Sequence, residues 1–424
     1  MSSLLASPLI LLGVVLALGA LLGDAAERVR VPWITGCILA GVSLGPGLGG
    51  VLDDGVLRAL DGFTQVALAV IAFNIGSQLV LSRLRSIGRS IVLLAAAQLF
   101  APFVLVLAAE SALGLAFPAA LVVAAVAPAT APTTTYSVIR RLNASGPFVD
   151  RVLGVLALND AAAVLIFSVA SAAALVLVSA DGSAATMTHA LLAAGANEIA
   201  SVAAGIALGV AYLGVRRLIE DATPGWEGRL TAMLLGLLVA SIGGAVALGL
   251  SHLLVPLSLG VVIANGVDGV ERERVHSLIR GFEEPLFIVF FVLAGAHLPL
   301  SAAEHLVVAS AAGVYLVGRF AGKYLGVFAT ASALGLDRPT RRYLGLCFPS
   351  QGALAMGLVL AFRGSPAVAA LPPSSLALIQ AAVSIILVAV LVSQIVDPLL
   401  IDLAVRRGSA APGPEAERSP PGRE

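Results

Sequence analysis

Charged side chains are scarce in this sequence. Asp, Glu, Lys and Arg make up 12% of the 424 residues, whereas 59% of the residues are hydrophobic. Soluble globular domains carry roughly twice that share of charge, and a soluble fold could not bury this much apolar surface. Several apolar stretches exceed the roughly 20 residues that cross the hydrocarbon core of a bilayer; they include 88–109, 152–178, 304–333 and 374–403. The composition therefore predicts an all-α integral membrane protein.

Other absences narrow the possibilities further. The formal net charge is zero, which gives no attraction for nucleic acid, and we expect no nucleic-acid partner. The only two cysteines, Cys37 and Cys347, lie in apolar runs and are interpreted as small membrane-embedded residues rather than a disulfide or a metal site. No cofactor is expected. No basic residue precedes the first apolar run, 7–23, which disfavours a cleaved signal peptide and favours a retained helix.

The apolar runs predict about thirteen membrane-spanning helices. The ninth is short, and the loop between the eighth and the ninth is very tight. The predicted spans are about 7–23, 31–48, 63–81, 88–109, 115–140, 151–178, 190–215, 229–250, 252–266, 282–298, 304–333, 342–362 and 374–403.

The distribution of arginine predicts the orientation of the spans. Cytoplasmic loops are enriched in Lys and Arg, and most arginines of this chain fall in every second loop. An odd number of spans then places the N-terminus outside and the C-terminus in the cytoplasm, in a multi-pass protein of the inner (plasma) membrane. The tail, 408–424, is rich in Pro, Gly and Ala and is predicted to be short and disordered. The arginines in the predicted cytoplasmic segments are Arg28, Arg30, Arg83, Arg85, Arg89, Arg140, Arg141, Arg151, Arg216, Arg217, Arg229, Arg272, Arg274, Arg280, Arg338, Arg341, Arg342, Arg406 and Arg407.

Ionisable residues inside the predicted spans stand out. Asp160 follows Asn159 in the sixth span, about 15 Å from the cytoplasmic end near Arg151. Lys323, the only lysine in the protein, lies about 16 Å deep in the eleventh span, with Arg319 one turn away. An ionisable group inside lipid costs free energy, so its presence indicates a function. The alternatives are a structural hydrogen bond for Asp160 and a purely structural cation for Lys323. Because a buried lysine can lose its proton, Lys323 is interpreted as a proton carrier or a titratable partner of Asp160.

Two spans are interrupted near the same depth. In the fifth, Pro128 and Pro132 flank Thr130. Proline removes a helix hydrogen bond, so free carbonyls and threonine hydroxyls become available as ligands for a hard cation, unless the prolines only kink the helix. The twelfth span is interrupted around Ser350 and Gln351. Two broken helices, an acid and a lysine are therefore predicted at one level of the membrane.

The interrupted spans lie seven apart, so they cross the membrane in opposite directions. This pattern predicts one transmembrane domain, 1–407, built from inverted repeats at about 1–178 and 229–403 and a connector helix at about 190–215. Paired broken helices in corresponding positions indicate the binding site of a secondary transporter.

Six segments, in the expected order, resemble the monovalent cation/proton antiporter superfamily, which includes the sodium/proton exchangers. The resemblance covers nearly the whole membrane part. It implies an inverted-repeat antiporter fold with two crossing discontinuous helices, a core of six helices that moves against a dimerisation domain, and a homodimer. The segments are VPWITGCILAGVSLGPG (31–47), ATAPT (129–133), LND (158–160), EEPLFIVFFVLAGAHL (283–298), GRFAGK (318–323) and PSQGALAMGL (349–358).

The candidate site combines these motifs. Asp160 and Thr130 are predicted to ligate the cation, Asn159 to orient Asp160, and Lys323 to handle protons. The supporting residues come from the two broken helices and the basic helix; they are Ala131, Pro132, Thr133, Ser350, Gln351 and Arg319.

Competition at Asp160 predicts the function. The carboxyl can be neutral with a proton or anionic with a cation, and an unpaired carboxylate is costly to move through the membrane, so exchange becomes obligatory. We expect a secondary antiporter that exchanges a monovalent cation, sodium ahead of potassium or lithium, for protons and serves pH homeostasis. Related proteins carry Asp-Asp with a lysine, or Asn-Asp with a Glu four residues earlier and an arginine; this chain has Asn159, Val155 and Lys323. One carboxylate in place of two suggests electroneutral one-for-one exchange.

Three other functions fit parts of the pattern. A sodium-coupled symporter of an organic solute needs a roomy polar cavity and more polar midplane residues than this chain has. A channel-like potassium efflux system usually carries a nucleotide-binding regulatory domain, for which the tail is too short. A membrane enzyme needs a catalytic cluster, and the five histidines are scattered along the chain.

Overall fold

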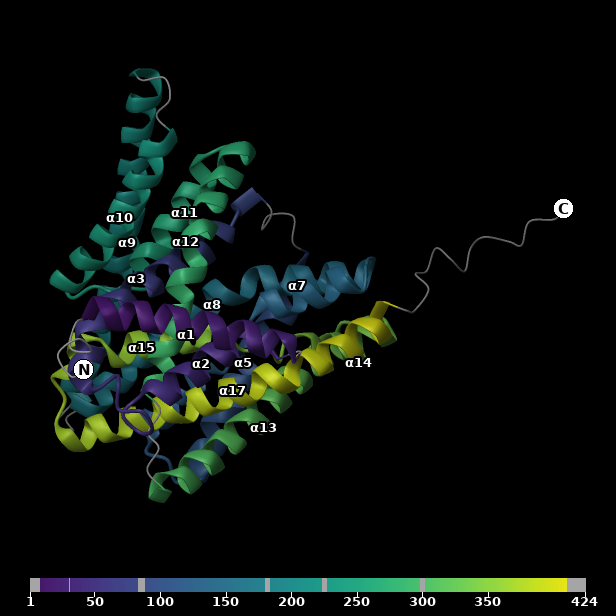
Figure 1. Cartoon of the computed structure of the whole chain (residues 1–424). Helices are drawn as coiled ribbons and strands as arrows, with labels where there is room; N and C mark the ends of the chain where they lie inside the picture. Colours follow the sequence, from purple (N-terminus) through teal and green to yellow (C-terminus); the bar gives the residue numbers. More distant parts are fainter. Residues whose placement is uncertain are drawn as a thin grey trace.

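The computed structural model describes residues 8–29, 31–82, 88–179, 184–222, 227–297 and 302–409. Every regular element within these ranges is a helix, as the composition predicts, and no strand occurs in them (Figure 1). Five of the described helices are long and apolar enough to cross a bilayer by themselves. The chain therefore has the build of a multi-pass membrane protein.

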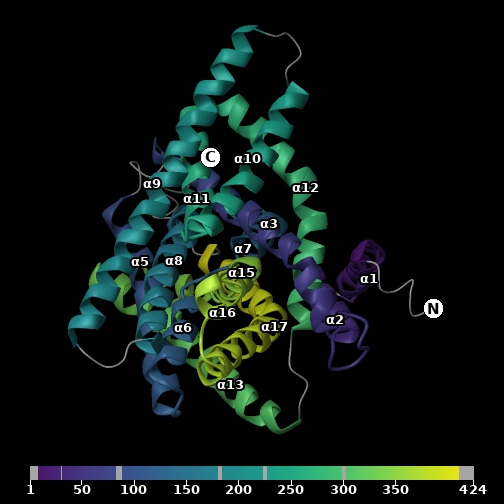
Figure 2. The same cartoon turned by 90° about the vertical axis from the view of Figure 1, so that its left-hand side faces the viewer.

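The helices, drawn in Figures 1 and 2, pack into two groups that contact each other. We call the first group the flanking helices. They are α1 (Pro8–Arg28), α2 (Trp33–Leu44), α3 (Asp54–Gln78), α9 (Ala184–Ala222), α10 (Glu227–Ala247), α11 (Leu254–Gly266) and α12 (Gly269–Ala296). Within this group α2 packs on α12, and α3 packs on α11.

The second group, the core helices, contains the candidate site. The core helices are α5 (Arg89–Ala112), α6 (Phe117–Val126), α7 (Pro132–Arg141), α8 (Pro147–Ser179), α13 (Ala302–Ala333), α14 (Arg338–Tyr343), the 3-10 helix η1 (Leu344–Cys347), α15 (Ala353–Arg363), α16 (Pro366–Ala369) and α17 (Pro373–Ser409). The two groups meet where α8 packs on α9 and where α15 packs on α3 and α12.

Both predicted interruptions are present. The segment predicted as the fifth span consists of α6 and α7, with non-helical backbone between Val126 and Pro132. In the segment predicted as the twelfth, η1 ends at Cys347 and α15 begins at Ala353. Pro132 opens α7, a position where the missing N–H of proline costs nothing.

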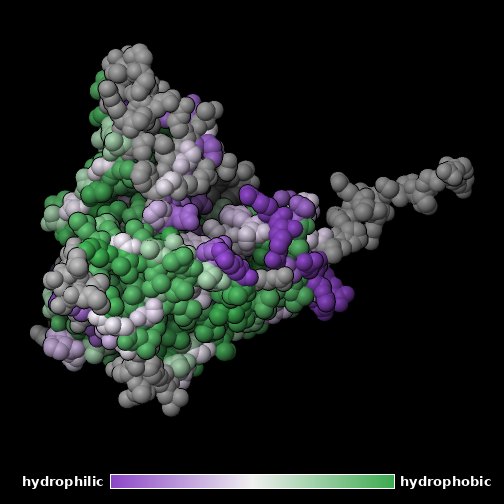
Figure 3. All heavy atoms as spheres, viewed as in Figure 1, coloured by the Kyte–Doolittle hydropathy of each residue, from purple (hydrophilic) through white to green (hydrophobic). Residues whose placement is uncertain are grey.

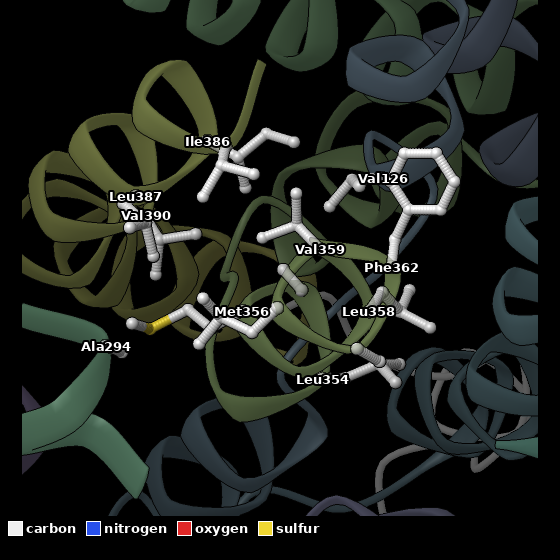
Figure 4. Packing of buried hydrophobic residues seen from close by; sticks show 14 of the residues in the cluster. Val126, Ala294, Leu354, Met356, Leu358, Val359, Phe362, Ile386, Leu387 and Val390 are labelled. Atoms are coloured by element: carbon white, nitrogen blue, oxygen red, sulfur yellow. The ribbon is translucent and has the colours of Figure 1, made fainter. Parts of the chain in front are cut away.

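Apolar packing anchors the short helix α15. Figure 4 shows its side chains Leu354, Met356, Leu358, Val359 and Phe362 beside Ile386, Leu387 and Val390 of α17, with Val126 of α6 and Ala294 of α12 at the edges. This cluster fixes both broken helices against the long helix α17, so the unwound segments hold a defined position.

Two helices begin well before the predicted spans. α12 begins at Gly269 rather than 282, and α3 begins at Asp54 rather than 63. Each start is set by an aspartate whose side chain accepts a backbone N–H, at 2.9 Å for Asp268 and 2.8 Å for Asp53. The added turns contain charged residues, so spans predicted from apolar runs do not include them. The predicted connector, 190–215, lies within α9, and of the predicted tail only Gly408 and Ser409, which continue α17, are described.

Polar residues gather at one end of the molecule. In Figure 3 they cover the region where α7, α14 and α17 end, whereas most of the remaining visible surface is apolar. At this end, which we call the basic end, Arg151 of α8 pairs with Asp337 at 2.5 Å. Burial raises the pKa of Asp337, but hydrogen bonds from Thr340 and Arg151 outweigh it and hold the pKa below its usual range.

Three glycines let α13 approach α5 very closely. Gly318, Gly322 and Gly326 are spaced by four residues and lie on one face of α13. A Cβ on Gly322 would collide with the backbone of Pro102, and one on Gly326 would meet Ala101 at 2.7 Å. Small residues at this spacing are typical of tight helix contacts in membranes, where van der Waals packing replaces the hydrophobic effect.

The variant Gly322→Ala should be less stable than the native protein by about 1–3 kcal/mol, because the methyl group has no space against Pro102. Gly313→Ala in the same helix is the matched control. Its Cβ meets nothing within 4 Å, so helix propensity should make it neutral or up to about 1 kcal/mol more stable. Thermal unfolding in detergent can be followed with a thiol-reactive fluorophore, since Cys37 and Cys347 are both buried. Equal melting temperatures for the two variants would contradict the tight α5–α13 contact.

Candidate cation and proton site

Asp160 lies near the middle of α8 and lines a cavity of about 290 Å³. Pro132 and Tyr136 of α7 form the wall on the core side. Arg272 and His276 of α12 line it on the flanking side. The cavity thus lies between the two groups of helices, and the Asp160 carboxyl on its wall is accessible to a small ligand that enters it.

A chain of hydrogen bonds leads from Asp160 into the core. Asn159 Nδ2 donates to Asp160 Oδ1 at 3.1 Å, and Asn159 Oδ1 accepts from Gln98 Nε2 of α5. Gln98 Oε1 in turn accepts from Lys323 Nζ of α13 at 2.6 Å. Asn159 and Gln98 are 0% exposed and Lys323 is 1% exposed. The lysine is therefore linked to the carboxyl through two amides rather than by a direct contact.

The ammonium group of Lys323 is fully hydrogen-bonded. Besides Gln98, it donates to the Pro128 carbonyl and to Thr130 Oγ1, both at 2.8 Å. These three acceptors match the three donors of an ammonium group. The carbonyl at Pro128 is available because the helix is broken there.

Thr130 lies in the first helix break. Its hydroxyl is buried and lies among Lys323, the Pro128 carbonyl at 3.4 Å and the Phe348 carbonyl at 3.5 Å. It is not among the residues that line the cavity beside Asp160. In this conformation Thr130 and Asp160 are connected through Lys323, and a shared cation ligand set stays a prediction.

Arg319 holds the two broken helices together. Its guanidinium donates to the carbonyls of Ala127 at 3.1 Å and Ala129 at 2.7 Å at the first break. At the second break it donates to the carbonyls of Pro349 and Ser350, the latter at 3.4 Å. Arginine presents five N–H donors in a planar fork, so one side chain can satisfy several carbonyls that the helix breaks leave open.

The supporting residues have distinct contacts. The Ala131 N–H donates to the Ser350 carbonyl at 2.7 Å, which joins the two breaks directly. Gln351 Nε2 donates to the Tyr315 hydroxyl at 2.6 Å and to the Val126 carbonyl at 3.2 Å. Thr133 is exposed in the first turn of α7 and makes no such contact.

Three polar residues of the site are absent from the sequence prediction. One is Gln98. Another is Thr135, whose Oγ1 donates to the Cys347 carbonyl at 3.0 Å. The third is Asp397 of α17, which is 6% exposed and accepts from Ser393 Oγ at 2.6 Å. A signal existed for Asp397, because it is an acid within a predicted span, like Asp160. Gln98 is an uncharged residue in an apolar run and gives a much weaker signal.

A carboxyl on a cavity wall, two helix breaks joined by hydrogen bonds and two buried basic side chains are typical of ion-coupled secondary transporters. A family model described as the transmembrane part of sodium/hydrogen exchangers matches residues 13–407, and the chain belongs to this family. Its members are transporters rather than enzymes, and the match supports cation/proton antiport.

Solved structures agree with this assignment. The structure of the sodium proton antiporter MjNhaP1 from Methanocaldococcus jannaschii at pH 8 is similar with a TM-score of 0.73 and 17% sequence identity, covering 95% of this chain and 99% of that chain. A structure from an electron microscopy map of the same antiporter is similar with a TM-score of 0.69 and 17% sequence identity, covering 96% of this chain and 99% of that chain. At this identity the likeness concerns the fold. A search of curated protein sequences finds no significant match.

The variant Arg319→Lys should be destabilised by about 2–4 kcal/mol although the charge is kept, because lysine cannot reach four carbonyls and leaves some of them without a donor. Arg342→Lys, on an exposed position of α14, is the control and should melt like the native protein. The thermal unfolding assay with the thiol-reactive fluorophore measures both. If Arg319→Lys also melts like the native protein, the Arg319 guanidinium is not needed to hold the two broken helices together.

Proposed function

We propose that this protein exchanges a monovalent cation, sodium in the first place, for protons, and that both ligands bind to Asp160. The observation that carries the proposal is the placement of this carboxyl on the wall of a cavity between the two helix groups. Membership of the sodium/hydrogen exchanger family supports the exchange of a cation for protons.

The proposed mechanism is competition for one carboxyl. When Asp160 is ionised it attracts a cation from the cavity, and when it holds a proton it offers no charge to the cation. Either ligand neutralises the site, and only the neutral site can be carried through the low-dielectric interior without a large cost. Movement of the core helices against the flanking helices would then present Asp160 to the other side of the membrane.

Asn159 and Gln98 give Asp160 a fixed orientation in this proposal. Asn159 donates one amide N–H to the carboxyl, and its own amide oxygen is held by Gln98, which is held by Lys323. A carboxyl oriented in this way keeps its second oxygen free for a ligand from the cavity. We propose that Thr130 joins the cation ligands only when Lys323 withdraws, because the ammonium group now holds the Thr130 hydroxyl and the Pro128 carbonyl.

The basic end would face the cytoplasm. Arginines of α7, α14 and α17 are concentrated there, and cytoplasmic surfaces of membrane proteins are enriched in arginine and lysine. This orientation places the N-terminus outside in an inner (plasma) membrane. The Asp160 cavity, which Arg272 and His276 line, would then open toward the cytoplasm. We further propose a homodimer and a role in pH homeostasis, as the family resemblance implies.

The variant Asp160→Asn should lose at least about 99% of sodium-driven proton exchange, because an amide cannot take up a proton at neutral pH and offers no negative charge for which a proton and a cation could compete. The assay is dequenching of a pH-sensitive dye in proteoliposomes, titrated with sodium, potassium and lithium. Asp150→Asn, an exposed acid on the same helix, is the matched control and should retain the native rate. Exchange that persists in Asp160→Asn would remove this carboxyl from the mechanism, and the titration ranks the three cations.

A sodium concentration jump on a solid-supported membrane should displace no net charge, because one proton leaves a single carboxyl for each cation that binds. This outcome requires that Lys323 keep its proton throughout, as its three hydrogen bonds favour. A sodium-dependent current that is absent in Asp160→Asn would instead indicate that a second group carries a proton and that exchange is electrogenic.

A further inference from the structure

A second carboxyl is buried in the core at a distance from Asp160. Glu110 lies in the last turn of α5 and is 0% exposed. Neither of its carboxyl oxygens has a hydrogen-bond partner. Buried polar groups in folded proteins are almost always paired, so an orphaned carboxyl needs a physical explanation.

Glu110 is on the face of α5 that carries Gln98. These two residues and Pro102 and Val106, which lie between them at steps of four, are all buried. Since α5 rises 1.5 Å per residue, Glu110 lies about 18 Å farther from the basic end than Gln98. It is therefore close to the opposite surface, two residues before α5 ends at Ala112.

The register of α5 and α13 places Glu110 beside Tyr315. The two helices run antiparallel, with Pro102 against Gly322 and Val106 against Gly318. The next turn along both helices brings Glu110 to the turn of α13 that contains Tyr315.

Few charged groups face Glu110. On α13 they are Tyr315 and, one turn deeper, Arg319, whose guanidinium is occupied by four backbone carbonyls. α6 carries no ionisable side chain, and α8 carries none beyond Asp160 in this direction. No basic side chain lies within ion-pair distance of Glu110 among the described residues. An ionised carboxylate in this position would have lost its water without gaining a partner, which is energetically unfavourable. The neutral form, which holds a proton, avoids that cost.

We propose that Glu110 is a second proton-binding site, which exchanges its proton with the solution on the side opposite the basic end. When the proton leaves to water, the carboxylate accepts a hydrogen bond from the Tyr315 hydroxyl. That hydroxyl now accepts from Gln351, which also donates to the carbonyl that ends α6. The charge state of Glu110 thereby acts on the helix crossing, and exchange at Asp160 becomes sensitive to pH on that side. This regulatory role rests on the proposed function, whereas the binding of a proton does not.

Infrared spectroscopy of the full-length protein in detergent at neutral pH tests the proton directly. The native protein should show the carbonyl stretch of a protonated carboxylic acid, and Glu110→Gln should lose part of this band. Glu110→Asp, which keeps a titratable group, should retain it. Ser111→Ala, at the exposed neighbouring position, is the control for local disturbance. An unchanged band in Glu110→Gln would overturn the proposal whether or not the protein transports ions.

Exchange in membrane vesicles of both orientations tests the consequence. In Glu110→Gln, the pH at half-maximal rate on the side opposite the basic end should shift by about one unit or more, which corresponds to a tenfold change in proton concentration. The pH dependence and the KM for sodium on the side of the basic end should stay at their native values. In Ser111→Ala, the pH dependence on both sides should match that of the native protein. A pH profile that does not move would overturn the regulatory role. Loss of all exchange in Asp160→Asn, with the Glu110 band still present, distinguishes this site from the one at Asp160.

Discussion

Unwound backbone inside a membrane must find hydrogen-bond partners within the protein, because lipid supplies none. In this transporter one side chain donates most of the hydrogen bonds that the unwound backbone receives. Arg319 donates to carbonyls on both broken helices, and the Ala131 N–H adds a direct bond between them. The Arg319 guanidinium therefore contributes the largest set of hydrogen bonds between the two breaks, and α17 and the apolar cluster around α15 support them by packing.

The candidate ion site follows from this crossing. Lys323 lies one turn from Arg319 on α13. Its ammonium group donates hydrogen bonds to the Pro128 carbonyl and the Thr130 hydroxyl at the first break. The glycines of α13 bring α5 close enough for Gln98 to reach Lys323, and Gln98 holds Asn159 beside Asp160. Three helices thus orient one carboxyl at a cavity. Both buried basic groups have neutral hydrogen-bond partners among the described residues, so the charge of Asp160 is not cancelled by a direct ion pair and stays available to a proton or a cation.

Much of this arrangement could be predicted from the sequence, because its signals are local. Prolines mark the first break, apolar length marks the spans, and the depths of Asp160 and Lys323 follow from the helical rise. Depth does not give the direction in which a side chain points. Depth put Thr130 level with Asp160, but it could not show that the Thr130 hydroxyl accepts a hydrogen bond from Lys323. The contact of Gln98 with Lys323 and the burial of Glu110 could not be predicted without knowing which face of α5 meets α13. The early start of α12 was missed because its first turns are charged and are fixed by an aspartate cap rather than by apolarity.

The central claim is that a cation and a proton cannot occupy Asp160 together. The most direct measurement is the number of protons released when sodium binds to the purified protein, by calorimetry in buffers of different ionisation enthalpy over a range of pH. The account predicts a sodium affinity that falls as the pH is lowered, with about one proton released per sodium bound at acidic pH. Sodium binding that releases no proton and does not depend on pH would contradict it.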